Sequence, residues 1–174
     1  MKLRLGTLIL TTFLLAAITR PVWGAPPPQG ISTPSPTIEN TVTAYDLITA
    51  VNQARTSNGL PALKVNAILM GTAQYTAEVM AANQMSVHIG GVSERVRAAG
   101  YAPGDTAWAT ENFVIGPLPV AQVMAAWSDA VHSIPAVNPA YCDIGAGVAE
   151  ANGAVYYVVH AAYSDRHACG EYRS

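Results

Sequence analysis

The sequence has little charge for its length. Only 9 lysines and arginines and 11 acidic residues occur among 174 residues, which is 11% of the chain, against about 25% in average domains. A formal net charge of −2 excludes a nucleic-acid binder that depends on electrostatic attraction. The hydrophobic fraction of 51% excludes a chain that is disordered throughout. The length fits one ordinary domain.

Motifs of the common catalytic classes are also absent. The sequence contains no Gly-x-Ser-x-Gly, no phosphate-binding P-loop, no Gly-x-Gly-x-x-Gly and no His-Glu-x-x-His, so several large enzyme classes are excluded. Ser128, Asp129 and His132 lie close together in the chain. A single helix rarely supplies the geometry of a catalytic triad and its oxyanion hole, so we do not expect one here.

The N-terminus has the layout of a secretory signal peptide. Lys2 and Arg4 precede a 14-residue run, Leu5–Ile18, in which charge is absent, and small residues follow at Gly24 and Ala25. A membrane-spanning helix needs about 20 apolar residues. We therefore expect a leader over residues 1–24 that is cleaved after Gly24, with an uncleaved membrane anchor as the alternative.

A proline-rich linker is expected after this leader, over residues 25–41. It holds five of the twelve prolines among Ser, Thr and Gly, a composition typical of extended linkers. Loss of the leader removes three basic residues and no acidic one. We expect the mature protein to be acidic, extracellular and monomeric, with its folded domain over residues 42–174, no affinity for nucleic acid and no membrane span.

Cysteine is scarce, with Cys142 and Cys169 the only two. In an exported chain such a pair predicts one disulfide. Zinc sites built on cysteine use a Cys-x-x-Cys spacing, which this chain lacks.

Helical spacing and capping residues predict four helices. The first begins at the N-cap Thr43 with Asp46 in a capping-box position and ends at Asn58-Gly59. The others are expected after Asn66, from Ser93 as N-cap to Gly100, and from Pro119, at the first helical position, to His132.

Alternating patterns predict three strands, 111–115, 144–149 and 155–163, with Asn152-Gly153 as a hairpin turn between the last two. Helices that precede an antiparallel sheet, with one helix inserted between strands, indicate an α+β domain.

Several conspicuous side chains have ordinary interpretations. We expect Tyr75 to lie in the core with its hydroxyl hydrogen-bonded, Trp127 to pack in the core, His160 to be a hydrogen-bonded histidine of the sheet, and His167 to be solvated. His88, Glu111 and His132 are more informative, because two imidazoles and a carboxylate in one cleft would suit zinc with a position left for water. Their proximity does not follow from the residues alone.

A set of short anchors occurs in a fixed order over residues 44–163. They are Asn52-x-x-Arg55, Leu60-Pro61-x-Leu63, His88, Arg95 with Gly100-Tyr101, Glu111-Asn112, Trp127 with His132, Asn138-Pro139, and Gly145-x-Gly147. In this order and spacing the chain resembles the CAP superfamily, the SCP-like domains of cysteine-rich secretory and pathogenesis-related proteins, in its short bacterial form.

The resemblance implies an α-β-α sandwich with a small central antiparallel sheet and a cleft that binds zinc in some members. By motif position, His88 and His132 match the cleft histidines and possible zinc ligands, and Glu111 and Asn112 match the Glu-Asn motif. Larger plant and animal members carry a further Glu where this chain has Ala130. Asp129 lies one residue earlier, which on a helix turns the side chain by about 100°. Bacterial relatives often have Gly where this chain has Thr110, and Arg where it has Ser133.

Three functions remain open at this point. The first is a non-enzymatic binding module for a lipid, a small apolar ligand or an envelope partner. The second is a metal-dependent hydrolase or peptidase in which His88 and His132 hold zinc and Glu111 acts as general base. In the third, the polar trio is a buried hydrogen-bond network that stabilises the fold.

Overall fold

The computed structural model describes residues 42–166. The expected leader and linker, His167 and Cys169 therefore lie outside the described residues. The elements, in chain order, are α1 (Ala44–Ser57), β1 (Lys64–Val65), α2 (Ala67–Ala82), α3 (Val92–Ala98), β2 (Ala107–Ile115), α4 (Val120–Ala126), α5 (Ile134–Val137), β3 (Asp143–Ala151) and β4 (Ala154–Ser164). No helix within 42–166 is long and apolar enough to cross a membrane.

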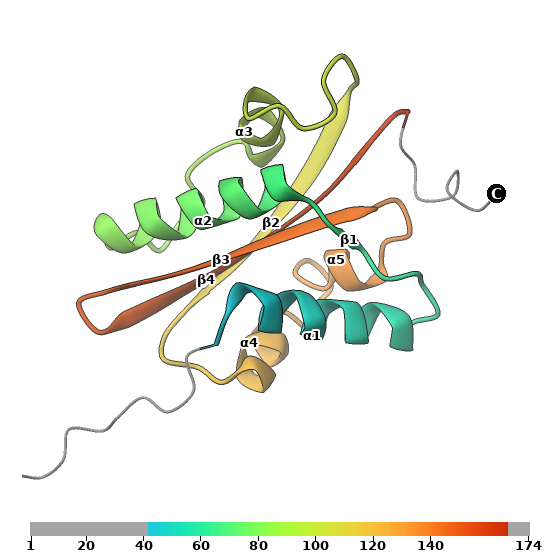
Figure 1. Ribbon diagram of the computed structural model, residues 1–174. Coiled ribbons are helices and arrows are strands. Elements are labelled where there is room, and N and C mark those ends of the chain that lie inside the picture. The colour runs from blue at the N-terminus through green and yellow to red at the C-terminus, as the bar shows by residue number, and fades with distance from the viewer. Residues whose placement is uncertain (1–41, 167–174) are drawn as a thin grey trace, which may run out of the picture. The chain divides into compact units, whose positions relative to one another are not determined.

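The strands form one four-stranded sheet in the order β1-β3-β4-β2. β3 and β4 form the expected hairpin, in which Asn152 and Gly153 both have positive φ, 53° and 76°, as the preferred two-residue turns require. β2 pairs with β4 antiparallel, whereas the short β1 pairs with β3 in parallel. α2 and α3 cover one face of the sheet and α1, α4 and α5 the other (Figure 1). The α+β class and the layered arrangement are confirmed.

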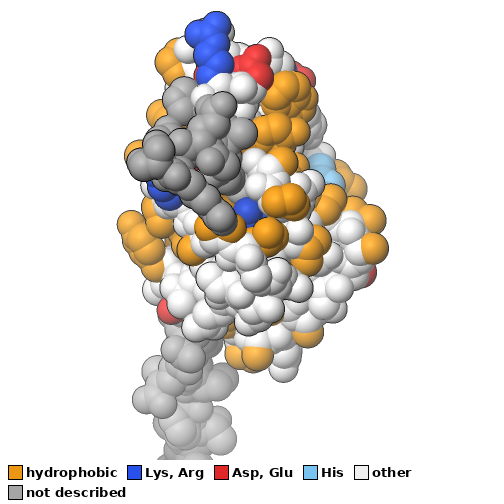
Figure 2. Space-filling view, turned by 90° about the vertical axis from the view of Figure 1, so that its right-hand side faces the viewer, with side chains coloured by type: hydrophobic (Ala, Val, Ile, Leu, Met, Phe, Trp, Pro, Cys, Tyr) orange, Lys and Arg blue, Asp and Glu red, His pale blue; other side chains and the backbone are white. Residues whose placement is uncertain are grey.

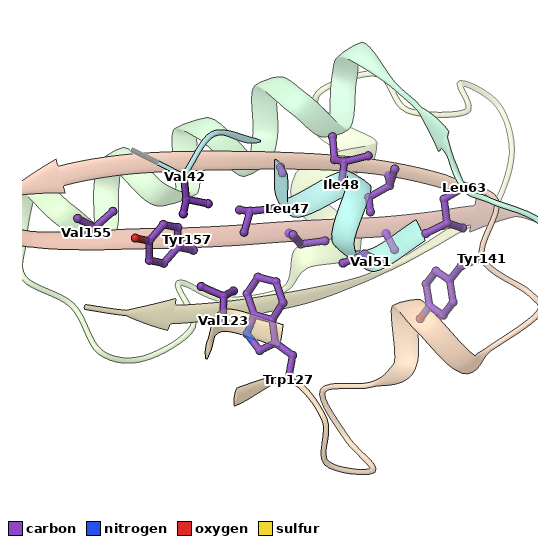
Figure 3. Packing of buried hydrophobic residues seen from close by; sticks show 14 residues of the cluster. Val42, Leu47, Ile48, Val51, Leu63, Val123, Trp127, Tyr141, Val155 and Tyr157 are labelled. Atoms are coloured by element: carbon purple, nitrogen blue, oxygen red, sulfur yellow. The ribbon is translucent and has the colours of Figure 1, made fainter. Parts of the chain in front are cut away.

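The face covered by α1 holds the largest hydrophobic cluster. Leu47, Ile48 and Val51 of α1 pack with Trp127 and with Tyr157 of β4 (Figure 3). Each such side chain contributes about 1.5–3 kcal/mol when fully buried. Trp127 is 3% exposed, and its Nε1 donates to the carbonyl of Phe113 at 3.2 Å, so its predicted role in the core is confirmed.

Arg55 is fully buried beside this cluster. Its guanidinium donates to four backbone carbonyls, of Pro61 (2.7 Å), Pro135 (3.0 Å), Asn138 (2.7 Å) and Tyr141 (2.8 Å). Burial lowers the pKa of Arg55, but an arginine remains protonated in proteins. One side chain thus connects α1 to the segment before β1, to α5 and to the segment that follows α5.

On the opposite face, α2 lies almost in backbone contact with β3. A Cβ added at Gly145 would come within 2.1 Å of the carbonyl carbon of Leu69, and one at Gly147 within 2.4 Å of the Cα of Gln74. Because of this close approach the Gln74 side chain reaches β3. Its Nε2 donates to the carbonyl of Val148 (3.1 Å), and its Oε1 accepts from the backbone amide of Val148 (3.0 Å). The Gly145-x-Gly147 pair therefore sets the distance between helix and sheet.

The cap of the first helix is confirmed, since Thr43 and Asp46 form both bonds of a capping box. α2 begins after Asn66 as expected, and Asn66 is its N-cap. Ser93 does not cap α3, because Gly91 occupies that position. The Ser93 hydroxyl instead accepts from the backbone amide of Ala109 at 2.9 Å. The N-terminal end of α3 is thereby attached to β2.

The fourth helix is shorter than its apolar pattern predicts. It ends at Ala126, with Pro119 as N-cap, and Val131 beyond it is 68% exposed. Asp129 Oδ1 accepts from the backbone amides of Val131 and His132 at 2.8 and 2.9 Å. Such local bonds from Asp compete with the helix, so His132 lies in a turn. The short elements β1 and α5 have no counterpart among the predicted helices and strands.

Candidate functional site

Glu111 is the centre of a buried polar cluster. It lies in β2 opposite His160 of β4, and its side chain, 2% exposed, points to the α2 face together with Phe113. Oε1 accepts from Nδ1 of His88 at 2.6 Å, and Oε2 accepts from Nε2 of His160 at 2.8 Å. Arg95 of α3 forms an ion pair with Oε2. We call Glu111, His88, His160, Arg95 and Thr72 the Glu111 cluster.

Electrostatics favour the ionised form of Glu111. Burial alone would raise its pKa, but hydrogen bonds from His160 and His88 and the positive charge of Arg95 outweigh that effect and hold the pKa below its usual range. A carboxylate of this kind only accepts hydrogen bonds. His88 and His160 therefore each direct a protonated ring nitrogen at it.

His160 lies at the deepest point of the cluster. Its side chain is fully buried, and burial lowers its pKa despite the opposing effect of Glu111. Because Nε2 carries the proton towards Glu111, Nδ1 of the neutral ring accepts from the hydroxyl of Thr72 of α2 at 3.0 Å. The prediction of a hydrogen-bonded sheet histidine holds, but its partnership with Glu111 was missed.

His88 and Arg95 connect Glu111 to the surface. The His88 side chain is 52% exposed, and its ring stands edge-on against Phe113 at 4.8 Å. Arg95 also donates to the carbonyl of Gly90. Within residues 42–166, Arg95 Nε is the only buried side-chain nitrogen or oxygen without a hydrogen-bond partner.

His132 does not join this cluster in the described contacts. Asn112 follows Glu111 in β2, so its side chain points to the other face, where Nδ2 donates to the carbonyl of His132 at 2.5 Å. The imidazole contacts Asp129 at 2.6 Å. Backbone and side-chain hydrogen bonds from His132 lower the pKa of Asp129 to about 2. The structure thus joins His88 to Glu111 and joins His132 to Asp129 and Asn112, but it does not join the two groups.

The residues of the Glu111 cluster do not fit a zinc ion. In the part of the chain that the structure describes, no group of three or more His, Cys, Asp or Glu residues is arranged to hold a metal. Both oxygens of Glu111 accept hydrogen bonds, and the cation beside them is Arg95. His132, the second expected ligand, is paired with Asp129.

A cavity of about 470 Å³ opens between α2 and α3. Two members of the Glu111 cluster, Thr72 and Arg95, contribute to its wall; the other lining residues are Ala67, Ile68, Gly71, Tyr75, Ala98 and Ala99. Tyr75 was expected in the core, but it is 61% exposed, because its position on α2 faces the cavity and not the sheet. The cavity is therefore apolar along most of its length and polar where it meets the cluster.

The surface carries few charged side chains, as the low charge content of the sequence predicts. On the face shown in Figure 2, hydrophobic and uncharged atoms outnumber the blue and red side chains. The exposed large hydrophobic residues among 42–166 include Tyr45, Tyr75, Val87 and Trp108.

Comparison with known proteins identifies the fold and the family. The profile of the cysteine-rich secretory protein family, CAP, matches residues 48–163. No curated protein sequence matches the chain.

Solved structures with the same fold come from distant organisms. An outer surface protein of Borrelia burgdorferi superimposes with a TM-score of 0.59 at 17% identity, over 68% of this chain and 90% of that one. An extracellular protein containing a SCP domain from Bacillus anthracis gives 0.56 at 17% identity, over 68% and 39%. Venom allergen-like protein 4 of Schistosoma mansoni gives 0.54 at 13%, over 72% and 91%. The chain thus spans about two fifths of the Bacillus protein.

Proposed function

The chain belongs to the cysteine-rich secretory protein family, and from this premise we propose that it is an exported, non-enzymatic binding module for a small apolar ligand. The observation that carries the proposal is the cavity between α2 and α3. Its volume of about 470 Å³ lies in the range of small-molecule sites, and its apolar wall with a few polar groups is their usual composition.

The polar end of the cavity supports the same function. Thr72 and Arg95 line it, and they are held by two other members of the cluster, His160 and Glu111 respectively. Groups that are fixed before a ligand arrives lose little conformational entropy when it binds. The cluster therefore acts as a rigid floor that orients the polar end of a ligand.

Export is supported by the leader-like N-terminus and by the relatives. Those relatives include an outer surface protein and an extracellular SCP-domain protein. We expect N-terminal sequencing of secreted protein to begin at Ala25. An intact Met1 would show an uncleaved anchor.

A disulfide between Cys142 and Cys169 belongs to the same proposal. It would close a 28-residue loop and stabilise the fold by about 3–4 kcal/mol in the chain-entropy model. A thiol assay on the unfolded, unreduced protein should count no free thiol; a count of two would contradict the disulfide.

A metal-dependent hydrolase built on His88, His132 and Glu111 has no specific observation in its favour. The first and second histidines have different carboxylate partners. Zinc is nevertheless the cofactor to assay. One equivalent in the purified protein, lost in His88→Ala, together with hydrolysis that chelators abolish, would restore the hydrolase.

The binding function is tested with a variant that fills the cavity. Gly71 lines it, and a Cβ at this position meets no atom within 4 Å, so Gly71→Leu extends into open space. We expect extraction and mass spectrometry of the secreted protein to recover an apolar ligand from wild type and from Gly71→Ala, but not from Gly71→Leu. Equal recovery from all three would contradict the proposal.

A further inference from the structure

β2 is an edge strand, so one side of its backbone has no neighbouring strand in the described sheet. Two hydrogen bonds just beyond its ends show which residues face that side. The amide of Asp165 donates to the carbonyl of Thr106 (3.0 Å), and the amide of Gly116 donates to the carbonyl of Val155 (2.8 Å). In an antiparallel ladder such bonded pairs occur at every second residue. The even-numbered residues of β2 therefore bond to β4, and the backbone groups of the odd-numbered residues point outward.

The outward groups on both sides of Glu111 are already occupied. The Ser93 hydroxyl of α3 accepts from the amide of Ala109 (2.9 Å), and Nε1 of Trp127 donates to the carbonyl of Phe113 (3.2 Å). The backbone amide and carbonyl of Glu111 have no such partner within residues 42–166. Glu111 as a whole is 7% exposed and its side chain 2%, so most of its accessible surface belongs to the backbone. The outer edge of β2 thus has a gap of one residue, which we call the Glu111 gap.

A histidine lies on each face of the sheet at the Glu111 gap. His88 bonds to the Glu111 side chain on the α2 face, and His132 lies beside the next residue of β2 on the other face. Each histidine follows an exposed valine, Val87 and Val131. When a peptide adds to the edge of a sheet, backbone bonds supply affinity and side-chain contacts on the two faces supply specificity. The Glu111 gap offers both kinds of contact.

The size of the gap selects its occupant. From Ala109 to Phe113 a strand extends about 13 Å at about 3.3 Å per residue, which leaves room for about three residues of an added strand. One guest residue in antiparallel orientation can exchange both of its backbone bonds with Glu111. The β2 edge of a second copy is flanked by the same helix and tryptophan, so two such edges cannot approach each other. A single extended segment can enter.

The side chains of the gap indicate which residues the segment carries. A guest residue directly opposite Glu111 places its side chain on the same face of the sheet, towards His88. Because Nδ1 of His88 donates to Glu111, Nε2 of the neutral ring is an acceptor. A serine or threonine hydroxyl supplies the donor. The guest residues on either side point to the opposite face, towards exposed Val131, and apolar side chains fit there.

We infer that the Glu111 gap binds an extended peptide segment of a partner protein by strand addition, with serine or threonine opposite Glu111 and an apolar residue on each side of it. The gap is a surface separate from the cavity between α2 and α3, so the inference goes beyond the proposed function.

Hydrogen exchange in the full mature protein, followed by NMR, tests the free edge first. The amides of Thr110 and Asn112 bond to β4, whereas that of Glu111 points outward. We expect the Glu111 amide to exchange at least about tenfold faster than either neighbour, because its open state needs no bond to break. Saturating acetyl-Gly-Val-Ser-Val-Gly amide should slow it at least about tenfold.

Methylated peptides test the backbone bonds. N-methylation of the serine removes the N–H that reaches Glu111 and should weaken binding at least about tenfold, the equivalent of about 1.4 kcal/mol. N-methylation of the second valine is the matched control, because that N–H points away from β2. It should change the affinity less than about twofold, as measured by NMR titration.

Valine variants test the flanks of the gap. The double variant Val87→Lys/Val131→Lys should weaken peptide binding at least about threefold by removing apolar contact, an effect of about 0.7 kcal/mol. Val65→Lys replaces an exposed valine of β1, at the opposite edge of the sheet, and should leave binding unchanged. Thermal unfolding shows whether each variant is folded.

Each other result overturns the inference. A Glu111 amide that is protected in the free protein would show that residues 25–41 or a second copy already fill the gap. Absence of slowed exchange at millimolar peptide would exclude strand addition, and equal binding of the two methylated peptides would place the peptide elsewhere. Equal effects of the double variant and Val65→Lys would exclude the flanks. None of these results changes the recovery of an apolar ligand, which tests the proposed function separately.

Discussion

A buried cation and a buried anion lie on opposite faces of the sheet, and they are held by different means. Arg55, under α1, is bound by backbone carbonyl oxygens. Glu111, under α2 and α3, is bound by the side chains of His88, Arg95 and His160. Carbonyls keep one chemical state, whereas imidazoles can gain or lose a proton and side chains can rotate. The α1 face therefore holds its buried charge through backbone groups, and the α2 face holds its buried charge through three side chains.

The largest effect is expected at Arg55. Arg55→Met leaves four carbonyls in the interior without their donor, and each unsatisfied buried acceptor costs about 1–3 kcal/mol. We expect the free energy of unfolding, measured with urea, to fall by about 3 kcal/mol or more. Arg55→Lys is the control, since one ammonium cannot replace the planar donor set and should recover only part of the loss. A loss below about 1 kcal/mol in Arg55→Met would remove the contrast between the two faces.

A smaller loss is expected where α2 approaches β3. Gly147→Ala places a methyl group 2.4 Å from backbone atoms of Gln74, and overpacking of this kind costs about 1–3 kcal/mol. Gly71→Ala is a matched control on the same helix, because its methyl group meets nothing, and it should gain up to about 1 kcal/mol from helix propensity. Chemical denaturation of both variants checks the opposite signs. A neutral Gly147→Ala would show that α2 can shift.

Glu111→Gln tests the anion directly. The amide keeps the shape but abolishes the ion pair with Arg95 and weakens the bonds from two histidines, so we expect a loss of about 2 kcal/mol at pH 7. The lowered pKa of Glu111 means that its contribution is present above the usual value of 4.5 and is lost as the pH falls through the folded value. The difference between wild type and variant should therefore shrink below pH 4.5. A difference that stays constant down to pH 3 would contradict this assignment.

The smallest effects compare the two histidines of the predicted trio. His88→Ala removes a half-exposed partner of Glu111 and should cost about 1 kcal/mol. His132→Ala removes a ring that contacts exposed Asp129, and surface changes of this kind stay within about 0.5 kcal/mol. Recovery of the extracted apolar ligand should be unchanged in His132→Ala. Equal losses of stability and binding in both variants would show that the trio acts as one site.

Local signals in the sequence predicted local structure well. Thr43 with Asp46, Asn66, and Asn152-Gly153 each determine the backbone within a few residues, and all three were predicted correctly. The apolar spacing after Pro119 predicted a helix that is too long, because this spacing continues past Trp127. The Asp129 side chain ends the helix through bonds to its own neighbours, which hydrophobic periodicity does not detect.

The candidate site was predicted only in part, because its members meet through pairings that span the chain. The contact between His88 and Glu111 agrees with the family pattern. His160 lies opposite Glu111 because of the register between β2 and β4, and no turn links these strands to reveal it. Arg95 was visible as an anchor but not as a partner. Tyr75 was assigned to the wrong side of α2, since periodicity does not distinguish a face on the sheet from one on a cavity.

The contact between Gln74 and Val148 also bears on how the protein behaves at high concentration. Beyond Ile144 the outer edge of β3 has no neighbouring strand in the described sheet, and open edges recruit strands from other molecules. The Gln74 amide imitates such a strand by bonding both backbone groups of Val148, and the Met70 sulfur accepts from the amide of Ala146. Two side chains of α2 thus occupy backbone groups of this edge, and we expect them to hinder its pairing with a strand of another molecule. The two glycines of β3 let α2 come close enough to do so.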